Sequence, residues 1–266
     1  MASAALVRIG VAGALGRMGR VTAGVVKART DATLAALVDR PDMAGQDCDG
    51  MTLSTLADAL AACDVIIDFS TLAGSVALAQ AAAAHGGPAL VIASTGASDD
   101  EARMIEAAAD KVAMVRSGNF SLGVNLLAGL VARAARTLGQ EDWDIEIVEA
   151  HHRRKVDAPS GTALMLGEAA AKGRGVKLRS VEERGRDGMA GPRGPGAIGF
   201  AALRGGGIVG EHSIVFASED EIITLSHSAR DRALFARGAV AAALWVAGKP
   251  PDLYDMMDVL GFKADA

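Results

Sequence analysis

The sequence predicts an α/β protein with a Rossmann-type, doubly wound parallel sheet, followed by a second, α+β domain with an open mixed sheet. Over the first ~120 residues, short aliphatic runs alternate with alanine-rich helical segments, which is typical of parallel strands covered by helices on both faces. A loop with three glycines follows the first of these runs. Beyond Ser117, strand-like runs alternate polar and apolar residues, which indicates a sheet with one covered face.

The first part of the chain is expected to hold five strands and three helices. The strands are predicted at Val7–Gly13, Thr33–Asp39, Asp64–Ser70, Ala89–Thr95 and 112–117. The helices are predicted at 19–28, 75–86 and 99–110. The third helix opens with Asp99 and Asp100, where the helix dipole favours acids.

The second part is expected to hold fewer helices and a different sheet. Helices are predicted at 124–138 and 163–172, and strands at 143–152, 211–218 and 221–229. We expect the glycine-rich segment Gly185–Gly207 to be mobile and assign it no role. An apolar helix at 233–248 is expected to pack back on the first domain. The predicted domains are therefore 1–122 with 233–266, and 123–232.

Composition excludes several classes of protein. The net charge of −5 lacks the basic character of a nucleic-acid binder, and Cys48 and Cys63 are too few for a disulfide framework. The start carries Arg8 inside its apolar stretch, unlike a signal peptide. Residues 72–98 lack Asp, Glu, Lys and Arg, but Pro88 and several glycines argue against a membrane span. We expect a cytoplasmic protein without nucleic-acid or membrane partners.

The glycine loop GALGRMG, Gly13 to Gly19, lies between the first predicted strand and helix. Dinucleotide binding needs glycine there for a tight turn, for close approach to pyrophosphate and for packing of the helix on the strand. The N–H groups of the helix start then hold the phosphates. The spacing is GxxGxxG rather than GxGxxG, and alone it is a weak signal.

Asp39 strengthens this interpretation because it ends the second strand, 20 residues beyond Gly19, where an acid accepts hydrogen bonds from the adenosine ribose. The alternative is a turn-forming residue before Pro41. Asp39 favours NADH, whereas the neighbouring Arg40 offers a guanidinium to the 2′-phosphate of NADPH. The pair predicts that both NADH and NADPH are used.

Small and polar residues follow two more strands, where an open α/β sheet presents its carboxyl ends to a ligand. These residues are Ala93, Ser94, Thr95, Ser117, Gly118, Asn119 and Phe120. Small side chains leave room for nicotinamide, and Asn119 is a candidate partner for its carboxamide. Ordinary strand-to-helix turn chemistry explains them equally well.

The segment EAHHRRKVDAPSGTA, Glu149 to Ala163, carries the chemistry. His151 and His152 are adjacent in extended chain, so they point in different directions and have different roles. A histidine exchanges protons near neutral pH, and Lys155 offers a positive charge or a proton. Ser160, Gly161 and Thr162 form a helix N-cap with open N–H groups, a site for a carboxylate.

Each of these features has a structural alternative. Paired histidines at a strand end are often structural or solvated, Arg153 to Lys155 form a charged loop, and Pro-Ser-Gly-Thr is common capping chemistry. A metal is not expected, because adjacent histidines chelate poorly and no cysteine or carboxylate completes a tetrahedral set. Their concentration within 15 residues, in a chain with a nucleotide loop, favours the catalytic interpretation.

Four segments together resemble a known family. GALGRMGR, DFST (Asp68 to Thr71), EAHHRRKVDAPSGTA and GEHSIVF (Gly210 to Phe216) occur in the order and spacing of the 4-hydroxy-tetrahydrodipicolinate reductases, also called dihydrodipicolinate reductases. The resemblance runs nearly end to end, and the HHxxKxDAPSGT block is highly specific. Asp39, where Glu also occurs in the family, and ASTG, where GTTG is frequent, are departures that concern cofactor preference.

The resemblance implies roles for individual residues. It implies catalysis by His151 and Lys155, and substrate binding by His152, Gly161 and Thr162. The implied cofactor contacts are Gly13, Ala14, Leu15, Gly16, Arg17, Met18, Asp39, Arg40, Ala93, Ser94, Thr95, Ser117, Gly118, Asn119 and Phe120.

The resemblance also implies an activity and an assembly. The expected activity is the reduction of 4-hydroxy-tetrahydrodipicolinate, a small anionic dicarboxylate, with NADH or NADPH in diaminopimelate and lysine biosynthesis. The first domain would bind dinucleotide, and the second would bind substrate and assemble a homotetramer. The alternatives are another nicotinamide-dependent imine or amino-acid reductase on the same scaffold, and a non-catalytic NAD(P)H sensor.

Overall fold

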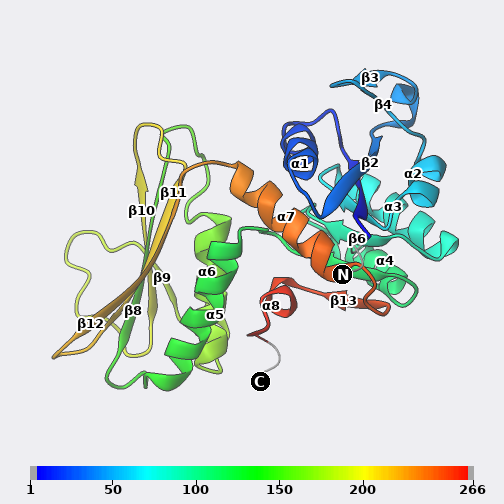
Figure 1. Cartoon of the computed structure of the whole chain (residues 1–266). Helices are drawn as coiled ribbons and strands as arrows, with labels where there is room; N and C mark the ends of the chain where they lie inside the picture. The colour runs from blue at the N-terminus through cyan, green and yellow to red at the C-terminus, as the bar shows by residue number, and fades with distance from the viewer. Residues whose placement is uncertain (1–4, 263–266) are drawn as a thin grey trace. The chain divides into compact units, whose positions relative to one another are not determined.

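The computed structural model describes residues 5–262, which form two compact units (Figure 1). The first unit holds residues 5–122 and 233–262, and the second holds residues 123–232.

The first unit contains a six-stranded sheet in which neighbouring strands run parallel. Its order is β13-β7-β6-β5-β1-β2. The strands are β1 (Val7–Ala12), β2 (Ala32–Val38), β5 (Val65–Asp68), β6 (Ala89–Ile92), β7 (Ala113–Arg116) and β13 (Asp252–Tyr254). The chain adds strands on one side of β1 and then on the other, so a ligand is expected beyond the carboxyl ends of β1 and β5. The predicted Rossmann-type sheet is confirmed.

Helices cover both faces of this sheet, as the sequence predicts. One face packs against α1 (Arg17–Lys27) and α7 (Ala233–Val246); the other packs against α2 (Leu56–Ala62), α3 (Leu72–His85) and α4 (Asp99–Ala109). Strand side chains alternate between the two cores: Ile67 lies on the α7 side with Val240, and Ile66 lies on the α3 side with Leu78.

The first unit differs from the prediction mainly in its short elements. The sequence did not predict the hairpin of β3 (Asp47–Cys48) and β4 (Met51–Thr52), helix α2, strand β13 or helix α8 (Met256–Val259). These elements are too short to show a periodic pattern of apolar residues. β6 ends at Ile92 rather than Thr95, so Ala93 to Thr95 form a loop after the strand.

The returning helix α7 packs tightly within the first unit. A β-carbon at Gly238 would lie 1.6 Å from the carbonyl oxygen of Phe120, so only glycine allows this approach. Helix α7 lies in the first unit, where it packs against α1 and against β5, β6 and β7.

The second unit contains a mixed, five-stranded sheet of order β12-β11-β8-β10-β9. The strands are β8 (Asp144–His151), β9 (Glu182–Arg184), β10 (Ile198–Arg204), β11 (Gly210–Ala217) and β12 (Ile222–Ala229). β8, β10 and β9 run parallel, whereas β11 is antiparallel to both of its neighbours. Helix α6 (Gly161–Gly173) packs on the sheet, and α5 (Leu122–Thr137) packs beside α6. The predicted open mixed sheet is confirmed.

The sheet face beneath α6 is apolar along most of β8 and polar at its end. Ile145 and Ile147 are fully buried there, and the next two positions on the same face are Glu149 and His151. The cross-strand partner of Glu149 is His212, and that of His151 is Arg204. Strand alternation therefore gathers four polar side chains at the carboxyl end of β8.

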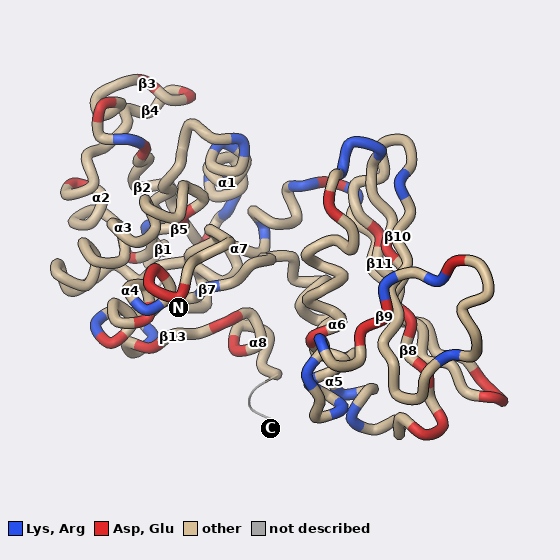
Figure 2. Tube along the Cα trace, turned by 180° about the vertical axis from the view of Figure 1, so that it is seen from behind, with Lys and Arg blue, Asp and Glu red and all other residues tan. Residues whose placement is uncertain are grey.

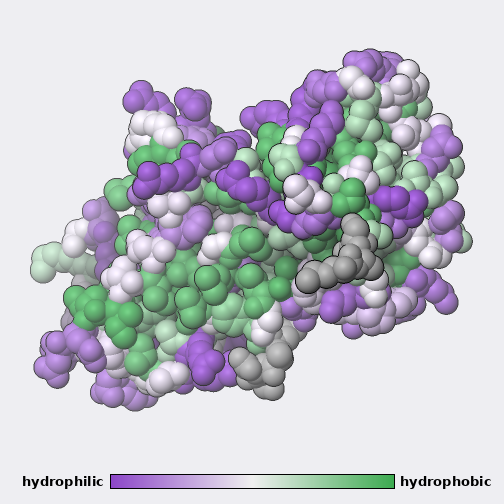
Figure 3. Space-filling model, viewed as in Figure 1, coloured by the Kyte–Doolittle hydropathy of each residue, from purple (hydrophilic) through white to green (hydrophobic). Residues whose placement is uncertain are grey.

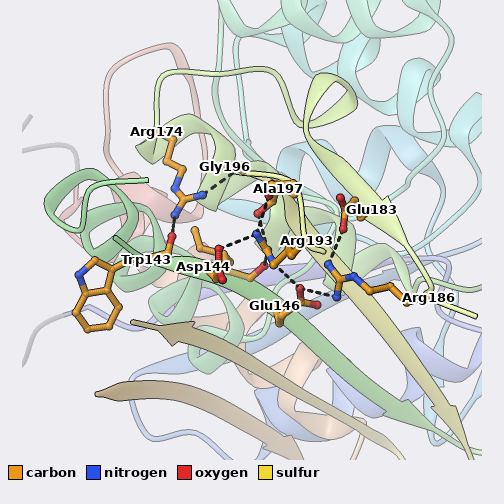
Figure 4. A network of polar contacts seen from close by, with 11 residues as sticks. Trp143, Asp144, Glu146, Arg174, Glu183, Arg186, Arg193, Gly196 and Ala197 are labelled. Atoms are coloured by element: carbon orange, nitrogen blue, oxygen red, sulfur yellow. Dashed lines mark hydrogen bonds and ion pairs between the residues drawn. The ribbon is translucent and has the colours of Figure 1, made fainter. Parts of the chain in front are cut away.

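The glycine-rich segment is more ordered than the sequence suggests. It contains β10, a strand between β8 and β9, so the expectation of a mobile segment is wrong for Ile198–Arg204. Arg193 anchors the preceding loop by donating hydrogen bonds to Asp144 and Glu146, and to the carbonyl oxygens of Ile145 and Ala197 (Figure 4). A network of this kind, between residues far apart in sequence, has no local sequence signal.

Charge and hydropathy vary over the surface of each unit. Lys and Arg are interspersed with Asp and Glu along both units (Figure 2). Apolar side chains are exposed over α5, where Leu122, Leu126 and Leu130 recur on one face of the helix (Figure 3). Within residues 5–262, none of the helices has the length and apolar character needed to cross a membrane.

Candidate active site

The glycine loop lies at the carboxyl edge of the first sheet and has the geometry that a pyrophosphate requires. Gly13 has a φ of +73°, and a β-carbon there would lie 2.8 Å from the carbonyl oxygen of Phe69. A β-carbon at Gly19 would lie 2.1 Å from the Gly13 carbonyl oxygen, so the helix starts directly against the turn. Gly16 is the N-cap of α1 and offers the helix no side-chain cap, which leaves backbone N–H groups for a phosphate. The loop fits a dinucleotide.

The other loop residues differ in exposure. Arg17 is exposed and Met18 half-buried in the first turn of α1, whereas Ala14 is buried and its N–H donates to the Val38 carbonyl oxygen. Contacts from Ala14 to a ligand are therefore restricted to its backbone.

Asp39 connects the end of β2 to this loop. Its Oδ2 accepts a hydrogen bond from the Leu15 N–H at 2.9 Å, and its Oδ1 accepts one from the Arg40 N–H at 2.9 Å. The Arg40 side chain is 70% exposed, and its Nε lies 4.0 Å from the Asp39 carboxylate. The structure thus brings Leu15, Asp39 and Arg40 together, as the cofactor hypothesis requires.

A cavity of about 600 Å³ lies against these residues within the first unit. It is lined by Ala12, Gly13, Leu15, Gly16, Val38, Asp39, Arg40, Pro41, Ala44, Ser54, Thr55, Leu56, Phe69, Ser70, Thr71, Gly74, Ala77 and Leu78. Its walls are mainly apolar, with the acid and the glycine loop at one side, which suits an adenine ring and its ribose. The sequence does not reveal the wall from Ser54 to Leu56, because it comes from the unpredicted α2 region.

The loops after β6 and β7 lie side by side. The Ser117 N–H donates to the Ile92 carbonyl oxygen, and a β-carbon at Gly118 would lie 3.8 Å from Thr95 Cγ2. The Asn119 Oδ1 accepts a hydrogen bond from the Ser121 N–H at 2.9 Å, so this oxygen already stabilises the turn. Phe120 is 2% exposed and packs in the core, which leaves only its backbone for a cofactor.

A buried carboxylate lies between these loops and the glycine loop. Asp68, the last residue of β5, accepts hydrogen bonds from the Ser70 N–H and the Ser75 hydroxyl. The Ser75 hydroxyl also lies 2.7 Å from the hydroxyl oxygen of Ser94, one of the predicted cofactor residues. Burial raises the pKa of Asp68, and the hydrogen bonds from Ser70 and Ser75 offset only part of this effect. The sequence offers one sign of this buried carboxylate: Asp68 is a charged residue at the end of an otherwise apolar strand.

In the second unit, the two adjacent histidines have different surroundings, as the strand pattern predicts. His151 is buried on the α6 side of the sheet, and its Nδ1 lies 2.6 Å from Glu149 Oε2. His152 is half-buried, and desolvation together with the positive charges of Arg154 and Arg232 lowers its pKa. His152 is therefore neutral at pH 7.

Ser160 caps α6 and is itself buried. Its hydroxyl accepts a hydrogen bond from the Ala163 N–H at 3.1 Å and lies 3.0 Å from His212 Nε2. These two contacts engage the Ser160 side chain in the cap. Gly161 and Thr162 form the first turn of α6. Gly161 is exposed and Thr162 is half-buried, and among the described residues nothing lies within 4 Å of the place a Gly161 β-carbon would take.

Lys155 lies in the turn between β8 and α6. Its Nζ pairs with Asp157 Oδ2 at 2.9 Å, and its side chain is 20% exposed. The hydrogen bond from Lys155 lowers the pKa of Asp157. The charge of Lys155 is thus partly balanced by Asp157.

Three residues join this cluster without having been assigned a role from sequence. Arg204 makes a bidentate ion pair with Glu149, with distances of 2.8 and 2.7 Å, and the His212 ring lies edge-on to His151 at 5.2 Å. Burial lowers the pKa of His212 to about 4. The position of Glu149 could have been predicted from the sequence: it lies two residues before His151 on a predicted strand, and residues two apart on a strand share a face.

Comparison with known proteins agrees with these features. The chain matches the family models described as dihydrodipicolinate reductase N-terminus, over residues 7–120, and C-terminus, over residues 123–260. It is 62% identical over 257 residues to the 4-hydroxy-tetrahydrodipicolinate reductase of Caulobacter vibrioides, covering 97% of this chain and 98% of that protein. It is 49% identical over 267 residues to the protein of the same name from Roseobacter denitrificans, covering 96% and 97%.

A solved structure shares the fold. The dipicolinate-bound dihydrodipicolinate reductase from Paenisporosarcina sp. TG-14 has a TM-score of 0.79 and 23% identity, covering 96% of this chain and 99% of that chain. With both family models matched in order and close relatives covered almost completely, the chain belongs to the dihydrodipicolinate reductase family.

Proposed function

We propose that this chain reduces 4-hydroxy-tetrahydrodipicolinate to tetrahydrodipicolinate with NADH or NADPH, a step of diaminopimelate and lysine biosynthesis. The observation that carries the proposal is the pairing of His151 with a buried carboxylate beside the accessible start of α6. The relatives that share 62% and 49% identity with the chain bear the name of this activity.

The first unit supplies the cofactor site in this proposal. The glycine loop and the start of α1 hold the pyrophosphate, while Asp39 and Arg40 contact the adenosine ribose beside the 600 Å³ cavity. Ala93 to Thr95 and Ser117 to Phe120 form the nicotinamide end of the site.

The second unit supplies the substrate site. The first turn of α6, at Gly161 and Thr162, holds one substrate carboxylate through its N–H groups and the positive end of the helix dipole. Lys155 adds a positive charge, with Asp157 as its partner before substrate binds. His152, which is neutral at pH 7, contributes hydrogen bonding without further charge. Ser160 supports this site as the cap of the helix.

When bound, NADH or NADPH would supply the hydride that reduces a conjugated carbon of the substrate ring, and the ring hydroxyl would leave as water. His151, assisted by Lys155, delivers the proton, a contribution of ~10²–10⁴ in rate for a positioned acid. Lys155 and the helix start stabilise the negative charge that develops on the ring. Turnover requires the cofactor held by one unit to reach the substrate held by the other.

We propose that the protein is cytoplasmic and assembles as a homotetramer through the second unit. The β-sheet face opposite α6 carries Leu203 and Ile222, which are 60% and 68% exposed. Exposed aliphatic residues on an open sheet face are typical of surfaces that associate. Light scattering, which measures the mass of the assembly, tests this. The wild type should have the mass of a tetramer, and Leu203→Glu should have a lower mass because the charged side chain dissociates the subunits.

Turnover with freshly made substrate tests the proposed activity. Pyruvate and aspartate semialdehyde are condensed enzymatically, and the loss of NADH and NADPH absorbance at 340 nm is followed after this chain is added. We expect oxidation of both cofactors only when the condensation product is present. Oxidation with another imine alone would favour a different reductase, and cofactor binding without turnover would favour a sensor.

A further inference from the structure

The carboxylate behind His151 is held more firmly than a chance neighbour would be. Glu149 precedes His151 by two residues on β8, so both side chains lie on the α6 side of the sheet. The side chains are 1% and 11% exposed, and 2.6 Å separates Glu149 Oε2 from His151 Nδ1.

Apart from the contact with His151, the hydrogen bonds of Glu149 come from groups that can only donate. Besides His151, the Ser160 N–H donates to Oε1 at 3.0 Å, and Arg204 donates to both oxygens. These four contacts fill about four acceptor positions of an ionised carboxylate. Burial alone would raise the pKa of Glu149, but the hydrogen bonds from Arg204 and His151 outweigh it and hold the pKa below its ordinary value. Glu149 is therefore ionised at neutral pH.

An ionised carboxylate only accepts hydrogen bonds, so the Nδ1 of His151 must be the donor. In the neutral imidazole, the proton is then on Nδ1 and the lone pair is on Nε2. The surroundings of Nε2 agree: a β-carbon at Gly210 would lie only 3.1 Å from it, so the glycine at the start of β11 places no side chain against this nitrogen.

Arg204 and His212 complete the arrangement. Arg204 also donates to the Asp157 carbonyl oxygen at 2.7 Å, so the Glu149–Arg204 pair holds His151, the start of α6 and the Lys155 turn in one geometry. His212 lies edge-on to His151 and is neutral, since burial lowers its pKa to about 4. His212 therefore adds no positive charge beside a protonated His151.

We propose that Glu149, held by Arg204, is a positioning residue that fixes the Nδ1–H tautomer of His151, so that the proton exchanged with substrate passes through Nε2. The proposal rests on the catalytic role of His151 in the proposed function. It assigns Glu149 no contact with substrate.

Nitrogen NMR of the histidine side chains tests the tautomer without any turnover. The chain has five histidines, and His151→Gln identifies the His151 signals. In the neutral imidazole of wild-type His151, we expect a protonated Nδ1 and an unprotonated Nε2. Glu149→Gln should shift the population toward Nε2–H, because the amide group can donate to Nδ1. A wild-type ring with its proton on Nε2, or an unchanged tautomer in Glu149→Gln, overturns the proposal.

Kinetics provide the second measurement. Glu149→Gln should lower kcat by about 10²-fold or more, with a smaller change in substrate KM, because the wrong tautomer behind a catalytic histidine costs up to ~10⁴. Glu146→Gln is the matched control: it lies on the opposite face of β8 and also bonds two arginines, yet it should keep wild-type kcat. Equal losses in both variants would contradict the positioning role. If the wild type itself does not turn over, the proposed function fails, while the tautomer measurement still decides the role of Glu149.

Discussion

The Asp39 carboxylate accepts a hydrogen bond from the backbone N–H of Leu15 at 2.9 Å, across 24 residues of sequence. This contact fixes the glycine loop after β1 against the end of β2. The same carboxylate borders the 600 Å³ cavity, so one of its oxygens organises the loop while the carboxylate as a whole faces the proposed ribose site. We therefore expect Asp39 to influence both the loop geometry and the choice of cofactor.

Replacing Asp39 by alanine should raise the KM for NADH about tenfold or more, since a hydrogen bond to a charged group contributes about 1.5–3 kcal/mol. The KM for NADPH should rise less, because removal of the carboxylate also removes its repulsion of the 2′-phosphate. Initial rates with each cofactor check this, with the exposed Asp42→Ala as control. An unchanged KM for NADH would show that Asp39 serves only the loop.

Arg40→Ala should have the opposite selectivity. The exposed guanidinium is available to the 2′-phosphate, and its loss should raise the KM for NADPH while sparing that for NADH. Arg20→Ala, which removes another exposed arginine, from α1, is the control. Equal effects of Arg40→Ala on the two cofactors would refute this role.

His151→Gln should lower kcat by ~10²–10⁴-fold, the range for removal of a positioned general acid. Substrate KM should change much less, because the proposed binding groups for the substrate carboxylates are α6 and Lys155 rather than His151. Steady-state kinetics separate the two parameters. A variant with near-normal kcat would remove His151 from the mechanism.

Gly238→Ala should destabilise the first unit by at least about 1–3 kcal/mol, the usual cost of overpacking. A β-carbon at 238 would lie 1.6 Å from the Phe120 carbonyl oxygen, so α7 must move. Gly24→Ala in α1 is the matched control: its β-carbon meets no described atom within 4 Å, and helix propensity predicts a gain of about 0.5–1 kcal/mol. Urea unfolding of both variants measures the difference. Equal stabilities would show that α7 does not make this close approach.

His212 should make stability fall in mildly acidic solution. Its pKa is lowered from 6.5 to about 4, because burial disfavours the charged form. Between these pH values, the unfolded chain binds a proton that the folded chain rejects, so His212 contributes a loss of up to about 1.4 kcal/mol per pH unit as pH falls.

Urea unfolding of the wild type and His212→Gln from pH 7 to pH 4.5 measures this slope. The variant should be less stable at pH 7 but should lose stability less steeply. His85→Gln, which removes an exposed histidine of the first unit, is the control. Parallel curves for wild type and His212→Gln would contradict the buried, neutral state of His212.

The long regular elements were predictable from sequence because their patterns are local. The buried runs of β1 and β5 and the apolar return of α7 reflect periodicity and composition alone. β10 was not predictable, because glycines flank it and Gly199 lies within it. The structure explains that glycine: a β-carbon at 199 would lie 2.0 Å from a carboxylate oxygen of Glu146 on the neighbouring strand.

The proposed site shows the same division. His151, Lys155 and the start of α6 belong to one continuous segment, so residue type and spacing identify them. Arg204 and His212 come from β10 and β11, and only the sheet register places them beside His151 and Glu149. The structure also changes the role expected for Ser160: its hydroxyl caps α6 by accepting a hydrogen bond from the Ala163 N–H.

A crystal structure of the chain with NADH and pyridine-2,6-dicarboxylate, the planar analogue of the substrate, would show whether His151 and the start of α6 receive the substrate. We predict one carboxylate on the N–H groups of Gly161 and Thr162, the ring beside His151 Nε2, and the nicotinamide C4 facing the ring. A dicarboxylate bound away from the β8–α6 turn, or a nicotinamide that cannot reach it in the complex, would rule out the proposed active site.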